Sequence, residues 1–510
     1  MAGTAVHDPL QTYDQAGRMF STCSLCRLQG GTAPEGECVA GSNWVAQMHN
    51  ELASVFEHIE RERGSSVDRL IDYVRHPSIS AHNLGIRDVA DRLVGMLTTM
   101  GLATSTVPTA GHPMVVARWS GAPGKPTVLF YGHYDVQPPE PLEAWTTPPF
   151  EPTIRDDRIF ARGVADNKGQ HLAQILAIEA HLKVHGRVPC NVIVLLEGEE
   201  EVGSPHIAEF IRAQRDMLQA DLAITADGQM HPSGRPNLKF GSRGVISFEL
   251  RVRHAKRDVH SGNFGGVVPN PLWTLVHLLA TMKDARGNIT IDGFHEAIIP
   301  ASAEERQATA RLPLDLPEFK RSLGLERLDL PDNRPFYERL SFHPTLTLNG
   351  IHGGYGGPGT KTVLPHEAIA KCDVRLVAAQ DPADIAAKIA AHVARHAPEV
   401  EFICNDKGMY PSKTPMNTPL AQPLQRAITT AYGSEPLLYP SGFGGLPGYV
   451  FTEIMGIPAF VVNYANADAA NHAPNENMTL ECFHNGIRCG AAILHELGQG
   501  MEQALLSTTV

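Results

Sequence analysis

Residues 192–204 read Val-Ile-Val-Leu-Leu-Glu-Gly-Glu-Glu-Glu-Val-Gly-Ser, a continuous apolar run followed directly by a cluster of carboxylates. The apolar run is typical of a strand that is buried on both faces of a sheet. Four carboxylates within five residues repel one another, so the cluster is costly unless a cation neutralises it. Because a core strand delivers the cluster, the pattern favours metal binding or acid–base chemistry. A solvated acidic turn is the alternative.

Similar apolar runs recur along the chain, with helical stretches such as His171–His185 between them. Buried strands that alternate with helices predict an α/β layer around a largely parallel sheet, whose chemistry gathers at the carboxyl ends of the strands. The other predicted strands of this layer are Met114–Trp119, Thr127–Tyr131, Leu222–Thr225 and Ala459–Val462.

Residues 241–410 form a second predicted unit, inserted into the first. Strands and helices are expected in the order βαββαβ, which is that of a ferredoxin-like sandwich. The expected elements are Val245–His254, Leu272–Met282, Leu346–Leu348, Ile369–Val377, Ala383–Ala397 and Val400–Cys404. Residues 46–240 and 411–510 then make one domain, and residues 241–410 are inserted into it.

Residues 1–45 differ from the rest, because they are rich in Gly, Ser, Thr and Ala and show no clear period. Cys23, Cys26 and Cys38 supply three of the four ligands of a structural zinc site. A loosely ordered extension is the favoured interpretation over such a metal site.

Composition excludes several classes of protein. With 43 Lys plus Arg against 55 Asp plus Glu, the net charge is −12, which argues against nucleic acid as the main partner. No apolar run approaches the roughly 20 residues of a membrane helix, and the start lacks the pattern of a secretory signal. Eight Cys in 510 residues do not suggest a disulfide framework, so a cytoplasmic location is expected.

Four more polar clusters follow predicted strands. In the first, His133 and Asp135 are expected to point to the same side, so that Asp135 orients a metal-binding imidazole; a hydrogen-bonded histidine at a strand end is equally compatible. The second, 163–169, also fits a simple helix cap. The third and fourth are centred on Asp227 and His472. Together the clusters supply His, Asp and Glu ligands that suit zinc, manganese or cobalt.

Other catalytic motifs are absent. The sequence contains neither HExxH nor GxSxG. Residues 353–362 resemble a phosphate-binding loop, but Thr360 stands where glycine should precede the lysine.

Taken in order, these clusters resemble the M20 family of dinuclear metallopeptidases, and within it the branch of cytosolic non-specific dipeptidases and carnosine dipeptidases. The resemblance runs from about residue 50 to the C-terminus and leaves out residues 1–45, so Met48 is a possible alternative start. The matching strings are Gly132-His133-Tyr134-Asp135-Val136-Gln137-Pro138, Asp166-Asn167-Lys168-Gly169, Glu200-Glu201-Val202-Gly203-Ser204, Asp227, His260-Ser261-Gly262 and His472 with Glu476.

The resemblance implies two divalent metal ions per chain, with zinc as the first expectation and manganese or cobalt as alternatives. Asp166 would bridge the two ions. His133 and Asp227 would complete one site, and Glu201 and His472 the other. Glu200 would act as general base on the bridging water. The Asp166–Asn167 peptide bond would be cis.

The resemblance also implies that residues 46–240 and 411–510 form a zinc-exopeptidase-like catalytic domain and that residues 241–410 are a dimerisation or lid domain. It implies substrate-binding residues and a homodimer formed through the inserted domain. His260 would stabilise the oxyanion in the partner's active site, and Thr362 would contact the substrate. Arg375 would bind the free carboxylate, although an ion pair with Asp373 on the sheet surface is an alternative. Gly445 occupies a position where the dipeptidases carry a substrate-contacting Ser, so specificity is expected to differ.

The leading hypothesis is a metal-dependent hydrolase that cleaves the amide bond of dipeptides or similar small substrates bearing a free carboxylate. An N-acyl-amino-acid deacylase or a carboxypeptidase of the same family is the enzymatic alternative. A catalytically inactive, metal-binding dimeric protein is the alternative from another class. Glu200 argues against it, because a mere binding site needs no second carboxylate beside Glu201.

Overall fold

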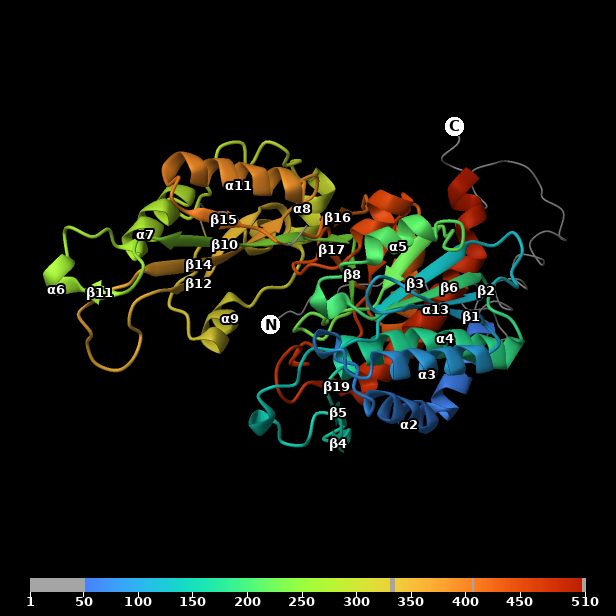
Figure 1. The fold of residues 1–510 in the computed structure, drawn as a ribbon. Coiled ribbons are helices and arrows are strands. Elements are labelled where there is room, and N and C mark those ends of the chain that lie inside the picture. The colour runs from blue at the N-terminus through green and yellow to red at the C-terminus, as the bar shows by residue number, and fades with distance from the viewer. Residues whose placement is uncertain (1–50, 331–334, 406–407, 507–510) are drawn as a thin grey trace, which may run out of the picture. The chain divides into compact units, whose positions relative to one another are not determined.

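The computed structural model describes residues 51–330, 335–405 and 408–506. The predicted extension 1–45, its three cysteines and Met48 lie outside the described residues. Every element labelled in Figure 1 belongs to the unit Ser54–Val510.

A mixed, mostly parallel sheet of eight strands forms the larger layer. Its three central strands, β6, β3 and β7, place the acidic cluster, His133 and Asp227 side by side. β6 pairs in parallel with β3, and β3 with β7, so their carboxyl ends meet at one edge of the sheet. β1 and β2 add antiparallel pairs at the far side. The order is β1 (Ala103–Val107), β2 (Met114–Trp119), β6 (Asn191–Glu197), β3 (Thr127–His133), β7 (Leu222–Thr225), β18 (Ala459–Val461), β8 (Asn237–Lys239) and β17 (Leu437–Tyr439).

Helices cover both faces of this sheet, which explains why the central strands are apolar throughout (Figure 1). On one face α4 (Gly169–His185) contacts β3 and packs against α13 (Leu480–Leu506), which packs against α12 (Ala421–Tyr432). On the other, α5 (Ile207–Ala213) and η6 (Val450–Met455) pack on Tyr131 and Leu195. The remaining helical segments of this layer are α2 (Arg63–Val74), α3 (Ile86–Thr99), η2 (Ser80–His82), η3 (Leu142–Ala144), η4 (Val164–Lys168) and η5 (Glu200–Val202).

A second, four-stranded antiparallel sheet confirms the predicted βαββαβ order. Its strand order is β12–β14–β10–β15, and it has its own buried core. The elements in chain order are β10 (Gly244–Arg253), α7 (Pro271–Met282), β12 (Thr345–His352), β14 (Glu367–Leu376), α11 (Pro382–His396) and β15 (Glu401–Ile403). α7 and α11 pack over the sheet (Figure 1). The domain boundaries at 240/241 and 410/411 stay predictions.

Three helices between α7 and β12 were not predicted: α8 (Ala303–Ala310), α9 (Leu316–Leu323) and α10 (Phe336–Phe342). A signal for the first was present. The Ser302 hydroxyl accepts from the Glu305 amide and the Glu305 carboxylate accepts from the Ser302 amide, which is a capping box. The helices α3, α5, α12 and α13 of the larger layer and its strands β1, β8 and β17 were not predicted either. Further unpredicted elements are short: α6 (Ser261–Phe264) and the small sheets β4 (Thr153–Arg155)–β5 (Arg158–Phe160)–β19 (Asn477–Thr479), β9 (Gly241–Ser242)–β16 (Ser412–Lys413) and β11 (Val259–His260)–β13 (Val363–Leu364).

None of the helices in the described ranges is long and apolar enough to cross a membrane. No disulfide joins the described cysteines, which are Cys190, Cys372, Cys404, Cys482 and Cys489. The cytoplasmic location stays a prediction.

We predict that Leu195→Ala destabilises the protein by about 2–5 kcal/mol, because Leu195 is fully buried in the core beneath α5. Denaturant unfolding followed by circular dichroism measures this change. The matched control is Leu142→Ala, since Leu142 is 54% exposed. Equal effects of the two substitutions would contradict the assignment of the core.

Candidate metal centre

Asp166 stands at the centre of the polar residues that the strand ends bring together. Its Oδ1 lies 3.2 Å from Nε2 of His133, and its Oδ2 lies 3.1 Å from Nε2 of His472. Each imidazole has a second carboxylate beside it. Asp227 Oδ2 is 3.4 Å from His133 Nε2, and Glu201 Oε2 is 3.3 Å from His472 Nε2. The site therefore consists of two His–carboxylate pairs with Asp166 between them.

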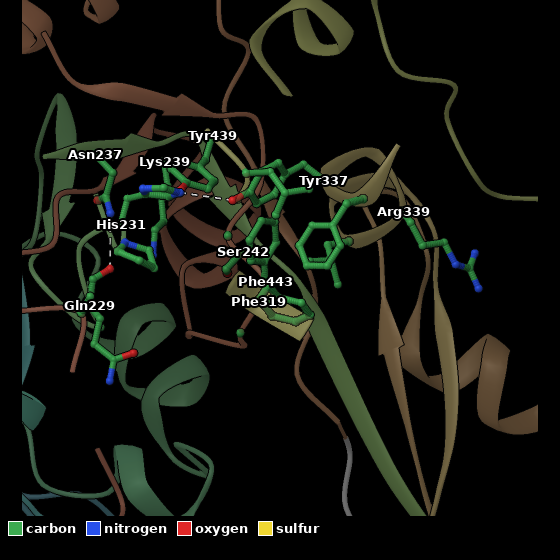
Figure 2. Close-up of a pocket in the computed structure, with 18 of the residues that line it drawn as sticks. Gln229, His231, Asn237, Lys239, Ser242, Phe319, Tyr337, Arg339, Tyr439 and Phe443 are labelled. Carbon is green, nitrogen blue, oxygen red and sulfur yellow. Dashed lines mark hydrogen bonds between the residues drawn. The ribbon is translucent and has the colours of Figure 1, made fainter. Parts of the chain in front are cut away.

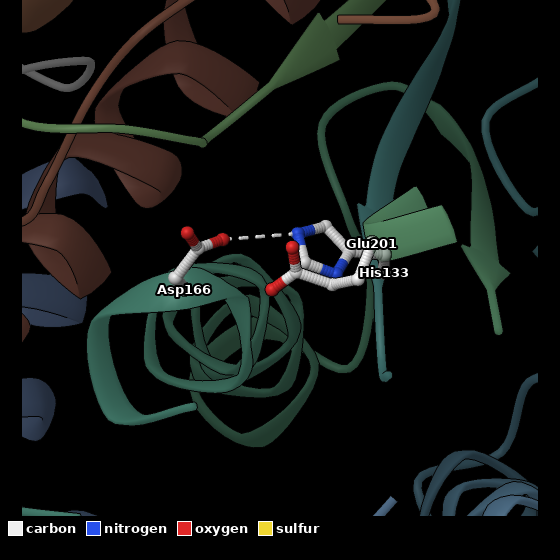
Figure 3. Close-up of side chains that lie close together, drawn as sticks. All are labelled: His133, Asp166 and Glu201. Atoms are coloured by element: carbon white, nitrogen blue, oxygen red, sulfur yellow. Dashed lines mark ion pairs between the residues drawn. The ribbon is translucent and has the colours of Figure 1, made fainter. Parts of the chain in front are cut away.

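Different elements deliver these side chains. His133 ends β3, Glu201 lies in η5 after β6, and Asp227 follows β7 by two residues. Asp166 lies in η4, the turn that opens α4, and His472 lies in the loop before β19. Figure 3 shows His133, Asp166 and Glu201 converging from three of these elements. The parallel order of β6, β3 and β7 is what places residues so distant in the chain together.

The backbone around Asp166 is held by a buried carboxylate. The Asp166–Asn167 peptide bond is cis, as predicted. Glu476 accepts from the amides of Gly163 (2.8 Å), Ala165 (2.9 Å) and Asp166 (3.0 Å). The Arg162 guanidinium donates to it as well, at 2.8 Å, and both side chains are buried. The family resemblance includes Glu476 but implies no role for it, and its contacts make it the anchor of this turn.

Asn167 connects the same turn to two strands. Its Oδ1 accepts from the His133 amide at 3.3 Å, and its amide group donates to the Ala226 carbonyl. His171 Nδ1 lies 3.1 Å from Asn167 Oδ1, and Tyr73 hydroxyl lies 3.0 Å from His171 Nε2. These contacts fix β3, η4 and the end of β7 relative to one another.

Asp135 lies beside His133, as its spacing predicts, and makes further contacts that the spacing does not indicate. The nearest acceptor to His133 Nδ1 is the backbone carbonyl of Asp135 at 3.1 Å, and the carboxylate lies 3.4 Å away. That carboxylate accepts from the amides of Glu200 (3.2 Å) and Glu201 (3.1 Å). Asp135 thus touches His133 but also fixes the loop that carries the acidic cluster.

The electrostatics are those of a site that needs cations. Burial raises the pKa of Glu200 well above its ordinary value, and the neighbouring carboxylates of Asp227 and Glu201 add to this shift. Burial opposes the charge of Asp166, but His133 and His472 hold its pKa below the ordinary value. Contacts with Asp166 and Glu201 raise the pKa of His472 to about 10. Four carboxylates in one buried place are compatible only with strong positive partners.

The residues present fit divalent metal ions. Nε2 of His133 and Oε1 of Glu201 are buried and have no hydrogen-bond partner among the described residues. Ligand atoms of His133, Asp166 and Glu201 lie within 4.8 Å of one another. Nitrogen and carboxylate donors of this kind suit zinc, manganese and cobalt.

A cavity of about 1500 Å³ opens from this cluster. Asp166, Glu200, Asp227 and His472 line it at one end, and Gly445 lines it further along. Arg375 lies in β14 beside Gly445, because a Cβ on Gly445 would be 3.5 Å from Arg375 Nη1.

His260 and Thr362 are placed together but apart from the cluster. Thr362 Oγ1 lies 3.2 Å from His260 Nε2, and both side chains are exposed. Neither residue is among those that line the cavity.

The sequence did not single out three residues that contact the cluster or line the cavity. Asn471 donates to Asp166 Oδ2 at 3.1 Å, and Gln137 donates to Glu201 Oε2 at 2.9 Å. Gln137 belongs to the matching string 132–138, and Asn471 directly precedes His472. Lys239 lines the cavity; its signal was a lysine between Leu238 and Phe240 in an apolar stretch.

Comparison with known proteins agrees with this geometry. The profile of peptidase family M20/M25/M40 matches residues 129–496. The chain is 27% identical to the human Beta-Ala-His dipeptidase over 471 residues, which are 88% of this chain and 93% of that protein. It is 28% identical to a Cys-Gly metallodipeptidase of Schizosaccharomyces pombe, with 88% and 99% covered. A solved M20 family metallo-carboxypeptidase from Sulfolobus solfataricus superposes with a TM-score of 0.80 at 33% identity, covering 85% and 99% of the two chains.

Replacing Glu476 tests the anchor. We expect Glu476→Ala to cost about 3–5 kcal/mol of stability, because Arg162 is left buried without its partner. Asp166 loses its support, so metal affinity should also fall by roughly 10–100-fold. Denaturant unfolding and metal titration measure the two effects. The matched control is Glu481→Ala, whose carboxylate pairs with Arg63 at the surface; a Glu476 variant that behaved like this control would refute the role.

Proposed function

The chain belongs to peptidase family M20/M25/M40 and is a metal-dependent peptidase, and on this premise we propose that it hydrolyses dipeptides or similar small amides that bear a free carboxylate. The single observation that carries the proposal is Asp166 between two His–carboxylate pairs. The relatives named as Beta-Ala-His and Cys-Gly dipeptidases, matched over 88% of this chain, support the choice of substrate.

Two divalent ions, zinc first and manganese or cobalt next, would be held by five ligands. We assign His133 and Asp227 to one ion, Glu201 and His472 to the other, and Asp166 to both. When bound, such ions polarise a scissile carbonyl and lower the pKa of water. Their +4 charge against −3 from Asp166, Glu201 and Asp227 leaves the positive surplus that this chemistry needs.

Glu200 is proposed as the general base. Its carboxylate is 4.0 Å from His133 Nε2, and its side chain is 14% exposed at the cavity wall. From there it can take a proton from the attacking water and pass it to the leaving amine. The raised pKa suits a group that must hold the proton between these two transfers.

Arg375 is proposed to bind the substrate carboxylate. Its guanidinium is beside Gly445, and no ion pair joins it to Asp373 or to another described carboxylate. This geometry supports the clamp over the alternative of a surface ion pair with Asp373. Because Gly445 has no side chain, substrate can approach the guanidinium closely.

A carboxypeptidase is the second candidate, favoured by the Sulfolobus solfataricus neighbour. It would use the same base, metals and carboxylate clamp, and would differ only in the length of substrate that the cavity accepts.

A substrate panel tests the function. Protein loaded with zinc, manganese or cobalt is expected to cleave dipeptides, and dipeptide amides should be poor substrates. Chelation should abolish the activity.

Glu200→Gln should retain its metal and lose at least about 10²-fold in rate, the usual scale for removing a general base. Preference for acylated tripeptides would favour the carboxypeptidase, and full activity without metal would exclude both.

We further propose a homodimer formed through the four-stranded sheet. β12 is an edge strand with Leu348 48% and Ile351 40% exposed, and α7 exposes Trp273 by 60%. An open edge and exposed apolar side chains are typical of a surface that pairs. His260 and Thr362 lie outside their own cavity, so they would serve the active site of the second copy.

Subunit exchange tests this arrangement. Glu200→Gln and His260→Ala chains should each be inactive, and mixing them should restore about a quarter of wild-type activity. Half of the dimers are mixed, and one of their two sites pairs an intact Glu200 with the partner's intact His260. No recovery after exchange verified by mass spectrometry would show that His260 does not act in trans.

A further inference from the structure

The cavity continues from the metal-site candidates to a second group of side chains that no step above uses. Figure 2 shows Lys239, Tyr337, Tyr439 and Phe443 on its walls. Tyr337 and Phe443 stack with ring centroids 5.9 Å apart, and His231 lies 3.2 Å from the Tyr337 hydroxyl. The rings therefore pack on one another, and the polar groups of His231 and Tyr337 are within hydrogen-bond distance. The ammonium group of Lys239 is the exception.

Lys239 stands close to the metal-site candidates. It ends β8 and pairs with Val461 in β18, and Val461 pairs with Thr225, two residues before Asp227. Burial lowers the pKa of Lys239 to about 8, although Asp227 opposes the shift. Among the described residues, no carboxylate lies within ion-pair distance of its ammonium and no hydrogen bond holds it.

A glycine-rich loop, Gly442–Gly445, connects Lys239 with Arg375. The loop runs beside residues 241–243, since Gly442 donates to the Gly241 carbonyl at 2.8 Å and the Arg243 amide donates to the Gly444 carbonyl at 3.1 Å. At its start, a Cβ on Gly442 would meet Lys239 Cδ at 3.3 Å. At its end, a Cβ on Gly445 would meet Arg375 Nη1 at 3.5 Å. The two cations therefore border one short loop of four residues, which spans at most roughly 14 Å.

A third cation strengthens the positive potential here. Arg243 is 3% exposed, and its guanidinium donates to Thr345 Oγ1 at 3.0 Å and to the Leu340 carbonyl at 3.4 Å. Its Nε has no partner among the described residues. Burial and the nearby charge of Arg375 lower the pKa of Arg243 to about 10. Arg243 and Arg375 lie behind the lining residues Ser242 and Gly445, and with Lys239 they make the potential at this end of the cavity positive, which attracts anions.

We infer that the residue on the carboxyl side of the scissile bond carries a second carboxylate, and that Lys239 binds it while Arg375 binds the α-carboxylate. This inference rests on the proposed function and names its substrate class: peptides that end in an acidic residue. The two carboxylates of one such residue are separated by only a few bonds, which suits two cations on one loop. A single carboxylate would leave one of them without a counter-charge.

Matched substrates test the inference. With the metal-loaded enzyme, kcat/KM for Ala-Glu should exceed that for the isosteric Ala-Gln by at least about tenfold. Lys239→Met should reduce this ratio to near 1, and Lys239→Arg, which keeps the charge, should preserve most of it. The control is Lys371→Met, because Lys371 is exposed and paired with Glu249; it should keep the wild-type ratio.

Calorimetric titration with free glutamate and free glutamine provides a readout that does not need turnover. Tighter binding of glutamate by wild type, lost in Lys239→Met, is expected. Equal values of kcat/KM for the two dipeptides, or a ratio that survives Lys239→Met, would overturn the inference while leaving the dipeptidase proposal intact. If no dipeptide is cleaved, the proposed function fails, and the calorimetric comparison still decides the role of Lys239.

Discussion

The constraint on which the site depends is that both oxygens of one carboxylate, Asp166, must face different imidazoles. Oδ1 faces His133 and Oδ2 faces His472, at 3.2 and 3.1 Å. A carboxylate can do this only if the backbone beneath it is fixed. Glu476 provides that support, although it lies about 310 residues further along the chain. Its carboxylate accepts hydrogen bonds from three backbone amides and from the Arg162 guanidinium. The buried charge of Glu476 is thus a structural requirement of the chemistry that we propose.

The two sheets supply different parts of the proposed active site. The parallel strands β6, β3 and β7 bring the acidic loop, His133 and Asp227 to one edge, so this sheet supplies the candidate ligands and the base. The antiparallel sheet supplies Arg375 from β14, and β8 supplies Lys239 beside the glycine-rich loop. Hydrolysis and substrate selection would therefore depend on different elements. Substitutions that alter specificity can then leave the ligand set untouched.

Much of this could be predicted from the sequence, because strongly apolar strands carry their own signal. The strands Met114–Trp119 and Leu222–Thr225 were predicted with their observed bounds, and the βαββαβ order was correct. The helices α8–α10 were missed because each has only seven or eight residues, too few to establish a helical period over the usual window of about 11–18 residues. Asp135 shows another limit. Spacing placed it beside His133, but only the tertiary structure reveals its contacts with the amides of Glu200 and Glu201.

The central claim is that Asp166 is shared by two metal ions. Anomalous diffraction from crystals grown with zinc, measured on both sides of the zinc absorption edge, tests it most directly. The account predicts two zinc peaks per chain, one contacted by His133 and Asp227 and one by Glu201 and His472, with Asp166 contacting both. A single peak, or two peaks that share no ligand, would contradict it.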